Sequence, residues 1–231
     1  MTVSQTQKEF DTARASLDQL GRAVLDQLKA LCAGFEAHDH TALAAIVARD
    51  REIDRLELQL DNHCMLFIEN RAPLGPGFRF MLGAIEIARG LERAGDCIEY
   101  LAVHAMRAST LDEEFPEGYA IVRDMMGRVA IIVEKACLCW SSSSPELAHA
   151  TTKLVAPIEE LRSKAYRMAV SAIRADRVDA ELGMEVVLIA NMLETIGDIA
   201  AAMAETMLYI VSAQSVRHNR SERLATALRL G

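Results

Sequence analysis

Apolar residues recur along this chain every three to four positions over long stretches, which is the spacing of one face of an α-helix. Segments that contain Pro and Gly, such as 71–78 and 111–118, interrupt this pattern and require the chain to turn. Short connections between long amphipathic helices favour antiparallel neighbours. The fold class is therefore predicted to be all-α, with six helices at residues 10–35, 41–70, 79–107, 119–140, 145–174 and 180–214.

A short motif occurs twice in the chain. The segment LERAGD at 91–96 returns as LETIGD at 193–198, an offset of 102 residues, and Ile53 corresponds to Ile158 at an offset of 105. Self-similarity at a fixed period indicates repeated structural units. We therefore expect two repeats of three helices each, at residues 1–110 and 117–214, followed by a C-terminal tail at 215–231 that lies outside the core.

Each copy of the motif places two carboxylates on one helix face. Glu92 and Asp96 in the first copy, like Glu194 and Asp198 in the second, are four residues apart and so close enough to share one ion. The Gly before each Asp costs about 1 kcal/mol of helix propensity relative to Ala. Its presence in both copies suggests that a neighbouring helix or a ligand approaches closely there.

The preceding helix carries a matching acidic stripe of Asp50, Asp54, Glu57 and Asp61. If this helix runs antiparallel to the next one, Asp50 and Asp54 oppose the carboxylates of the first motif. Oxygen ligands alone select Mg²⁺, Mn²⁺, Ca²⁺ or carboxylate-bridged iron. The sequence therefore predicts a candidate metal site in the first repeat. A solvated acidic face, with Arg51, Arg55 and Arg93 as partners, is the alternative.

The second repeat offers fewer ligands than the first. Val155 and Glu159 stand where the first repeat has Asp50 and Asp54. A metal site formed by Glu194 and Asp198 is accordingly expected to be weaker.

Composition narrows the classes of protein that remain. Apolar residues make up 51% of the chain and charged residues 25%, as in ordinary folded proteins. The net charge of −8 argues against nucleic acid or anionic lipid as the main partner. The longest uncharged run, 206–216, is too short to span a bilayer, and no secretory signal is visible, so we expect a cytoplasmic protein without membrane insertion.

No motif of a known enzyme class is found in the sequence. It lacks the G-x-S-x-G and G-x-x-x-x-G-K patterns of hydrolases and nucleotide-binding proteins. A ferritin-type di-iron site would need two Glu-x-x-His pairs, and only Glu146 and His149 have that spacing. The chain is therefore not expected to be an enzyme.

The segments 10–28 and 42–61 and the two LExxGD motifs resemble the phosphate-uptake regulator family, PhoU. This resemblance implies a fold of two three-helix repeats. It also implies a cytoplasmic adaptor between a phosphate ABC transporter and its sensor histidine kinase, which dampens the phosphate-starvation response. Homodimerisation is a further expectation. Some relatives bind iron or other metals, and the resemblance implies Fe, Mn, Mg or Zn ions at Asp50, Asp54, Glu92, Asp96, Glu194 and Asp198.

Three positions depart from the family pattern. Tyr100 and Ala202 stand where an Asn commonly follows the motif, and Thr195 replaces the usual Arg of the second motif. Two other hypotheses therefore stay open: a carboxylate-bridged di-iron protein, and a helical scaffold that has no role in phosphate regulation.

Overall fold

The computed structural model describes residues 3–213, except for the side chains of residues 3–5, 49 and 50. The predicted tail at 215–231 lies outside the described residues. All regular structure in the described part of the chain is helical, as predicted. The helices are α1 (Val3–Glu36), α2 (His40–Arg71), α3 (Pro76–Arg107), α4 (Leu111–Glu114), α5 (Pro116–Ser142), α6 (Pro145–Thr152), α7 (Ala156–Arg174) and α8 (Ala180–Ser212).

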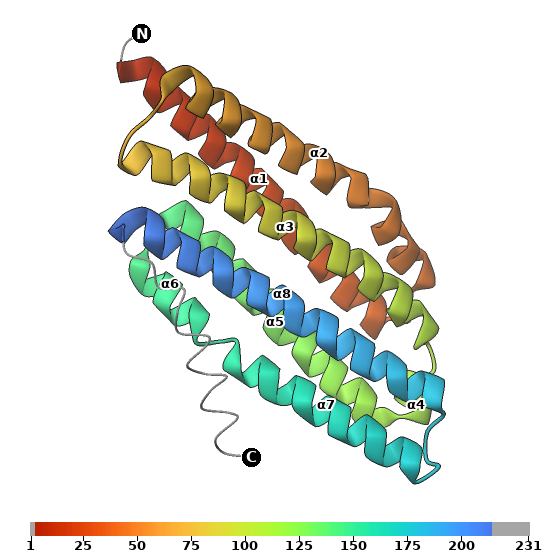
Figure 1. Ribbon diagram of the computed structural model, residues 1–231. Helices are drawn as coiled ribbons and strands as arrows, with labels where there is room; N and C mark the ends of the chain where they lie inside the picture. Colours follow the sequence, from red (N-terminus) through yellow and green to blue (C-terminus); the bar gives the residue numbers. More distant parts are fainter. Residues whose placement is uncertain (1–2, 214–231) are drawn as a thin grey trace.

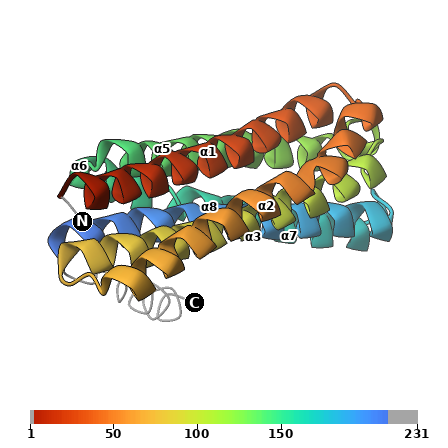
Figure 2. The same cartoon turned by 90° about the horizontal axis from the view of Figure 1, so that it is seen from above.

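The long helices form two bundles that lie side by side (Figure 1). In the first bundle α1, α2 and α3 pack on one another, and in the second α5, α6, α7 and α8 do so. The bundles meet through α3 against α8 and through α1 against α5. Figure 2 shows α1 and α5 on one side of the molecule and α3 and α8 on the other. The predicted all-α fold of two repeated bundles is confirmed, and the second bundle has one helix more than the predicted three.

Three helices begin at a proline. Pro76, Pro116 and Pro145 are the first residues of α3, α5 and α6, where the missing N–H leaves no intrahelical hydrogen bond unmade. The connection between α2 and α3 is accordingly shorter than the predicted turn at 71–78, because α3 already begins at its second proline.

The single helix predicted at 145–174 is wrong, because the chain breaks there into α6 and α7. Pro157 is the second residue of α7, and it can neither donate a hydrogen bond to the carbonyl of Lys153 nor fit beside it in a continuous helix. The chain instead turns at 153–155, where the Leu154 N–H donates to Thr151 O at 3.0 Å. Val155 turns inward at the break and is buried.

The contact between α3 and α8 is antiparallel and close. Near one end of this contact, a Cβ atom on Gly83 would lie 2.4 Å from Ile210 Cδ1, so only a glycine admits this approach without a shift. At the other end His104, which is buried, meets Glu185 with 2.5 Å between Nδ1 and Oε2. Both LExxGD motifs therefore lie level with each other, near the middle of the contact.

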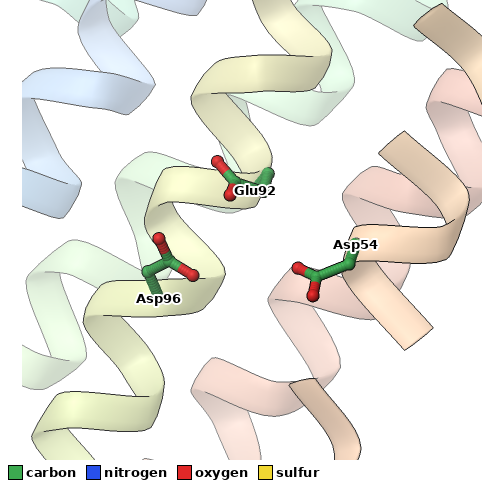
Figure 3. Close-up of side chains that lie close together, drawn as sticks. All are labelled: Asp54, Glu92 and Asp96. Atoms are coloured by element: carbon green, nitrogen blue, oxygen red, sulfur yellow. The ribbon is translucent and has the colours of Figure 1, made fainter. Parts of the chain in front are cut away.

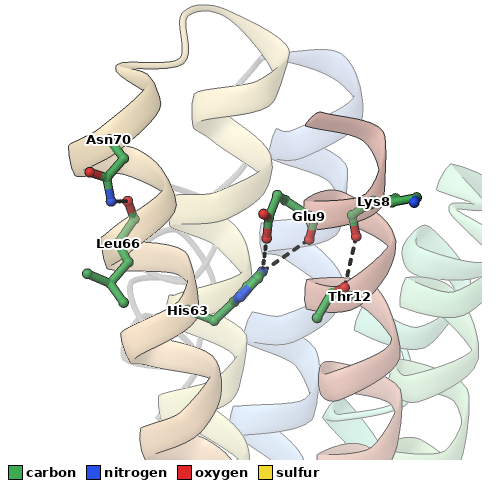
Figure 4. A network of polar contacts seen from close by, with 6 residues as sticks. All are labelled: Lys8, Glu9, Thr12, His63, Leu66 and Asn70. Carbon is green, nitrogen blue, oxygen red and sulfur yellow. Dashed lines mark hydrogen bonds and ion pairs between the residues drawn. The ribbon is translucent and has the colours of Figure 1, made fainter. Parts of the chain in front are cut away.

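Polar contacts tie α1 to α2 at the end of the first bundle. Figure 4 shows the His63 ring of α2 reaching Glu9 of α1. His63 Nε2 lies 3.1 Å from the backbone oxygen of Glu9 and 3.5 Å from its carboxylate. These contacts fix the relative position of two helices whose main attachment is apolar.

The last described helix, α8, is long and apolar enough to cross a membrane by length and composition alone. Our estimate from uncharged runs missed this, because scattered charges interrupt the run without making the helix polar on average. Half of its most apolar window is buried inside the fold, where α8 packs against α3, α5, α6 and α7. Its composition is therefore accounted for by its central position among the other helices.

The two motif glycines give a matched test of how closely each repeat is packed. A Cβ atom on Gly95 would lie 3.1 Å from Ile53 Cδ1, whereas a Cβ atom on Gly197 would lie 4.0 Å from Ile158 Cγ2. We expect Gly197→Ala to raise the free energy of unfolding by roughly 0.5–1 kcal/mol through helix propensity. The free energy of unfolding of Gly95→Ala should be about 1 kcal/mol lower than that of Gly197→Ala, because Ile53 must move to admit the new methyl group. Urea unfolding of both variants measures this, and equal midpoints would contradict it.

Candidate functional site

Three of the predicted carboxylates converge between α2 and α3. One oxygen each of Asp54, Glu92 and Asp96 lies within 4.8 Å of the other two, and all three residues are half-buried. Figure 3 shows Glu92 and Asp96 one turn apart on α3, with Asp54 facing them from α2. The predicted fourth member, Asp50, lies in α2 one turn before Asp54, and its side chain lies outside the described residues.

Close packing of α2 on α3 brings these carboxylates together. Ile53 of α2 packs so closely on Gly95 that a side chain at this position would displace it. Of the two expected neighbours of this glycine, a helix or a ligand, the structure therefore shows a helix. Two turns further along α2, Asp61 Oδ1 accepts a hydrogen bond from Arg89 Nη2 of α3 at 3.0 Å, which holds the antiparallel register.

Glu57 and Asp61 of the acidic stripe do not join the cluster. Asp61 is engaged by Arg89, as described. Burial, and then the negative charges of Asp61 and Asp54, raise the pKa of Glu57. Carboxylates at this density repel one another. Two unit charges about 4 Å apart cost roughly 4 kcal/mol at an effective dielectric constant of about 20.

A cation would offset the repulsion among the three converging carboxylates. Within the described part of the chain, neither Asp54 nor Asp96 forms an ion pair with a basic side chain. Arg93, which the sequence offered as an internal counter-charge, also forms no ion pair with any described residue. Hard divalent ions prefer carboxylate oxygens, so this donor set fits Mg²⁺, Mn²⁺ or iron.

The second motif is arranged differently. Glu194 of α8 forms an ion pair with Arg162 of α7, with 2.8 Å between Oε2 and Nε. Ile53 packs at Gly95 and Ile158 packs at Gly197, so the offset of 105 holds in space and Arg162 takes the place of Glu57. The sequence analysis did not identify Arg162, although applying this offset along α7 would have found it.

Opposing effects act on the Glu194 carboxyl group. Burial raises its pKa, and the nearby Arg162 guanidinium lowers it without cancelling the effect of burial. The negative charges of Asp198 and Glu159 raise the pKa of Glu194 further. A permanent cation from the protein itself is therefore present beside the second motif.

The Glu-x-x-His spacing on α6 has a local explanation. Glu146 Oε2 accepts a hydrogen bond from Ser144 Oγ at 3.0 Å, and Ser144 in turn caps α6 by accepting from the Leu147 N–H. Backbone and side-chain hydrogen bonds accordingly lower the pKa of Glu146. Its role at the start of the helix gives the di-iron hypothesis no support.

Arg162→Ala should destabilise the fold in a pH-dependent manner. A folded-state pKa of Glu194 above its ordinary value of 4.5 means that stability falls as the pH rises through this range. Removing Arg162 raises the pKa of Glu194 further. We therefore expect the free energy of unfolding to fall by about 1 kcal/mol at neutral pH. The decrease should be smaller near the ordinary pKa, because the protonated acid needs no charged partner there. Arg128→Ala, which breaks the half-exposed pair with Asp124, is the control. Urea unfolding at the two pH values measures both, and an equal loss at each pH for Arg162→Ala would contradict the expectation.

Comparison with known proteins gives a consistent result over almost the whole chain. The chain is 24% identical over 211 residues to the phosphate-specific transport system accessory protein PhoU homolog 1 of Thermotoga maritima, covering 91% of this chain and 90% of that protein. It is 26% identical over 228 residues to a PhoU homolog of Burkholderia sp, covering 96% and 95%. The crystal structure of PhoU from Pseudomonas aeruginosa has the same fold, with a TM-score of 0.85 at 22% identity, over 90% of this chain and 99% of that one.

The sequence profile of the PhoU domain matches residues 17–104 and again residues 122–207. The two matches cover more than half of the chain, and each includes one LExxGD motif. The resemblance drawn from the two motifs is thus confirmed, and the chain belongs to the PhoU family.

Proposed function

We propose that this chain is an accessory protein that regulates phosphate transport. The observation that carries the proposal is the pair of LExxGD motifs, which lie level with each other on α3 and α8 in a two-repeat fold. Relatives that align over nearly the whole chain bear the name of phosphate-specific transport system accessory proteins, which supports the same role.

The finer part of the proposal concerns location and partners. The chain acts in the cytoplasm as an adaptor between a phosphate ABC transporter and its sensor histidine kinase, and it restrains the phosphate-starvation response. Regulation by protein contact rather than catalysis agrees with a sequence that lacks hydrolase and nucleotide-binding motifs. Residues 1–110 and 117–214 serve as the two functional repeats in this proposal, with 215–231 as a separate tail.

Deleting the gene should raise expression of phosphate-starvation genes when phosphate is plentiful. An adaptor that signals phosphate sufficiency keeps the kinase from activating these genes, so its loss removes the restraint. A transcriptional reporter in phosphate-rich medium measures the effect, in a strain with no second copy of the gene. Expression that stays at the repressed level would favour a helical scaffold without a phosphate role.

We also propose that Asp54, Glu92 and Asp96 bind a divalent metal ion, with Asp50 as a fourth ligand. The mutual distances of up to 4.8 Å among the three oxygens support this, because one ion can contact ligands at such separations. Mg²⁺, Mn²⁺ and Fe²⁺ suit the oxygen donors best, and Zn²⁺ is a further candidate. Glu194 and Asp198 would bind such an ion less tightly, since Arg162 already supplies a positive charge beside them.

Replacing Asp96 by Asn should weaken metal binding more than the same replacement of Asp198. The two substitutions are nearly isosteric and remove one negative charge from equivalent positions of the two motifs. Isothermal titration with Mn²⁺ or Fe²⁺ is the measurement, and the absorption spectrum of the iron-loaded protein reports bridged iron. Negligible heats for the unchanged protein would leave the acidic face as a solvated or partner-binding surface.

A further inference from the structure

A groove runs along the outer side of the contact between α3 and α8. Its volume is about 480 Å³. Apolar atoms of Ile85, Ile87, Ile199 and Met203 line it, and all four residues are largely buried. The exposed Leu82 lies at one end of the lining and Arg93 at the other. An apolar floor that opens to the surface is a feature of grooves that receive a helix.

The groove is open because two small residues lie on either side of it. Gly90 of α3 and Ala202 of α8 are both part of its lining. A Cβ atom on Gly90 would lie 3.4 Å from Ile199 Cγ2, which is an ordinary van der Waals contact. Unlike Gly83, Gly90 is therefore not required by the packing of α3 on α8. The absence of a side chain at Gly90 instead leaves space in the groove.

The second repeat does not reproduce these features. At the motif offset of 102 residues, Gly90 corresponds to Met192 and Arg93 to Thr195. Ala202 corresponds in the same way to Tyr100, whose side chain is 61% exposed. The strip related to the groove by the repeat thus carries larger side chains and lacks the arginine. The groove is therefore a feature of one side of the molecule, although the backbone on the other side is related to it by the repeat.

Three charged residues, Glu86, Arg89 and Arg93, are part of the groove lining. Arg89 is engaged by Asp61. The exposed Arg93 forms no ion pair with any residue in the described part of the chain. A carboxylate from outside is the partner that Arg93 is suited to bind.

We propose that this groove, which we term the Arg93 groove, binds an amphipathic helix of a partner protein. The partner helix places an apolar stripe on the floor and a row of acidic residues along the edge at Arg93. The stretch from Leu82 to Arg93 is about 16 Å long, so roughly three turns of helix cover it. This inference goes beyond the proposed regulatory role and does not depend on the metal site.

The test uses two synthetic peptides of about 18 residues, long enough to exceed three helical turns. Both carry leucines at helical i, i+3, i+4 and i+7 spacing, with glutamates on one flank in the first and lysines at the same positions in the second. We expect saturable binding of the glutamate peptide to the full chain, measured by fluorescence anisotropy. Arg93→Glu should weaken this binding about tenfold and transfer the preference to the lysine peptide. Ala202→Trp should weaken both peptides by filling the groove.

Matched substitutions on the opposite side of the molecule are the controls. Arg22→Glu and Ala15→Trp change exposed residues of α1 and should leave peptide binding unchanged. Equal binding of both peptides, or binding that Arg93→Glu and Ala202→Trp leave intact, would overturn the proposal, as would no binding of the glutamate peptide. Dimers that Ala202→Trp disrupts would instead assign the groove to a second copy. Binding to phosphatidylglycerol vesicles that Arg93→Glu abolishes would assign it to a membrane.

Discussion

The antiparallel packing of α3 against α8 joins the two repeats and sets the position of both motifs. Gly83 lets the helices approach at one end, and the buried contact of His104 with Glu185 fixes them at the other. Each helix also forms one wall of its own bundle, so a shift along this contact would move α2 and α7 as well. The candidate metal site and the Arg93 groove both depend on the register that this contact fixes.

Two solutions to the same electrostatic problem lie on opposite sides of this contact. In both repeats a Glu and an Asp one turn apart are held half-buried beside a neighbouring helix. The second repeat supplies a guanidinium from Arg162, whereas the first places Asp54 at the cluster and Glu57 where that arginine would be. The second repeat therefore has a permanent cation beside its motif, whereas the first has a third carboxylate there. The two repeats thus share a backbone fold but place different charged side chains beside their motifs.

The helical fold and its repetition could be predicted from the sequence, because apolar periodicity and the repeated LExxGD motif are local patterns. The convergence of Asp54 with Glu92 and Asp96 also followed, since an antiparallel neighbour brings these positions together. The break at Pro157 was missed because apolar spacing continues on both sides of it. Arg162 was missed because the offset of 105 was applied to Ile53, Asp50 and Asp54 but not to Glu57, whose counterpart is Arg162. The rotamer that pairs Arg162 with Glu194 is fixed by the packing of α7 on α8 and is not contained in the residue pattern.

The position of α8 near the end of the described chain has a consequence for biosynthesis. A ribosome completes α3, α5, α6 and α7 before this helix emerges, so each surface that α8 covers has already been synthesised. A segment apolar enough to resemble a membrane span is exposed to insertion machinery and to aggregation while it lacks partners. Synthesising it after those partners shortens that interval, and a circular permutation that moved α8 to the front would lengthen it.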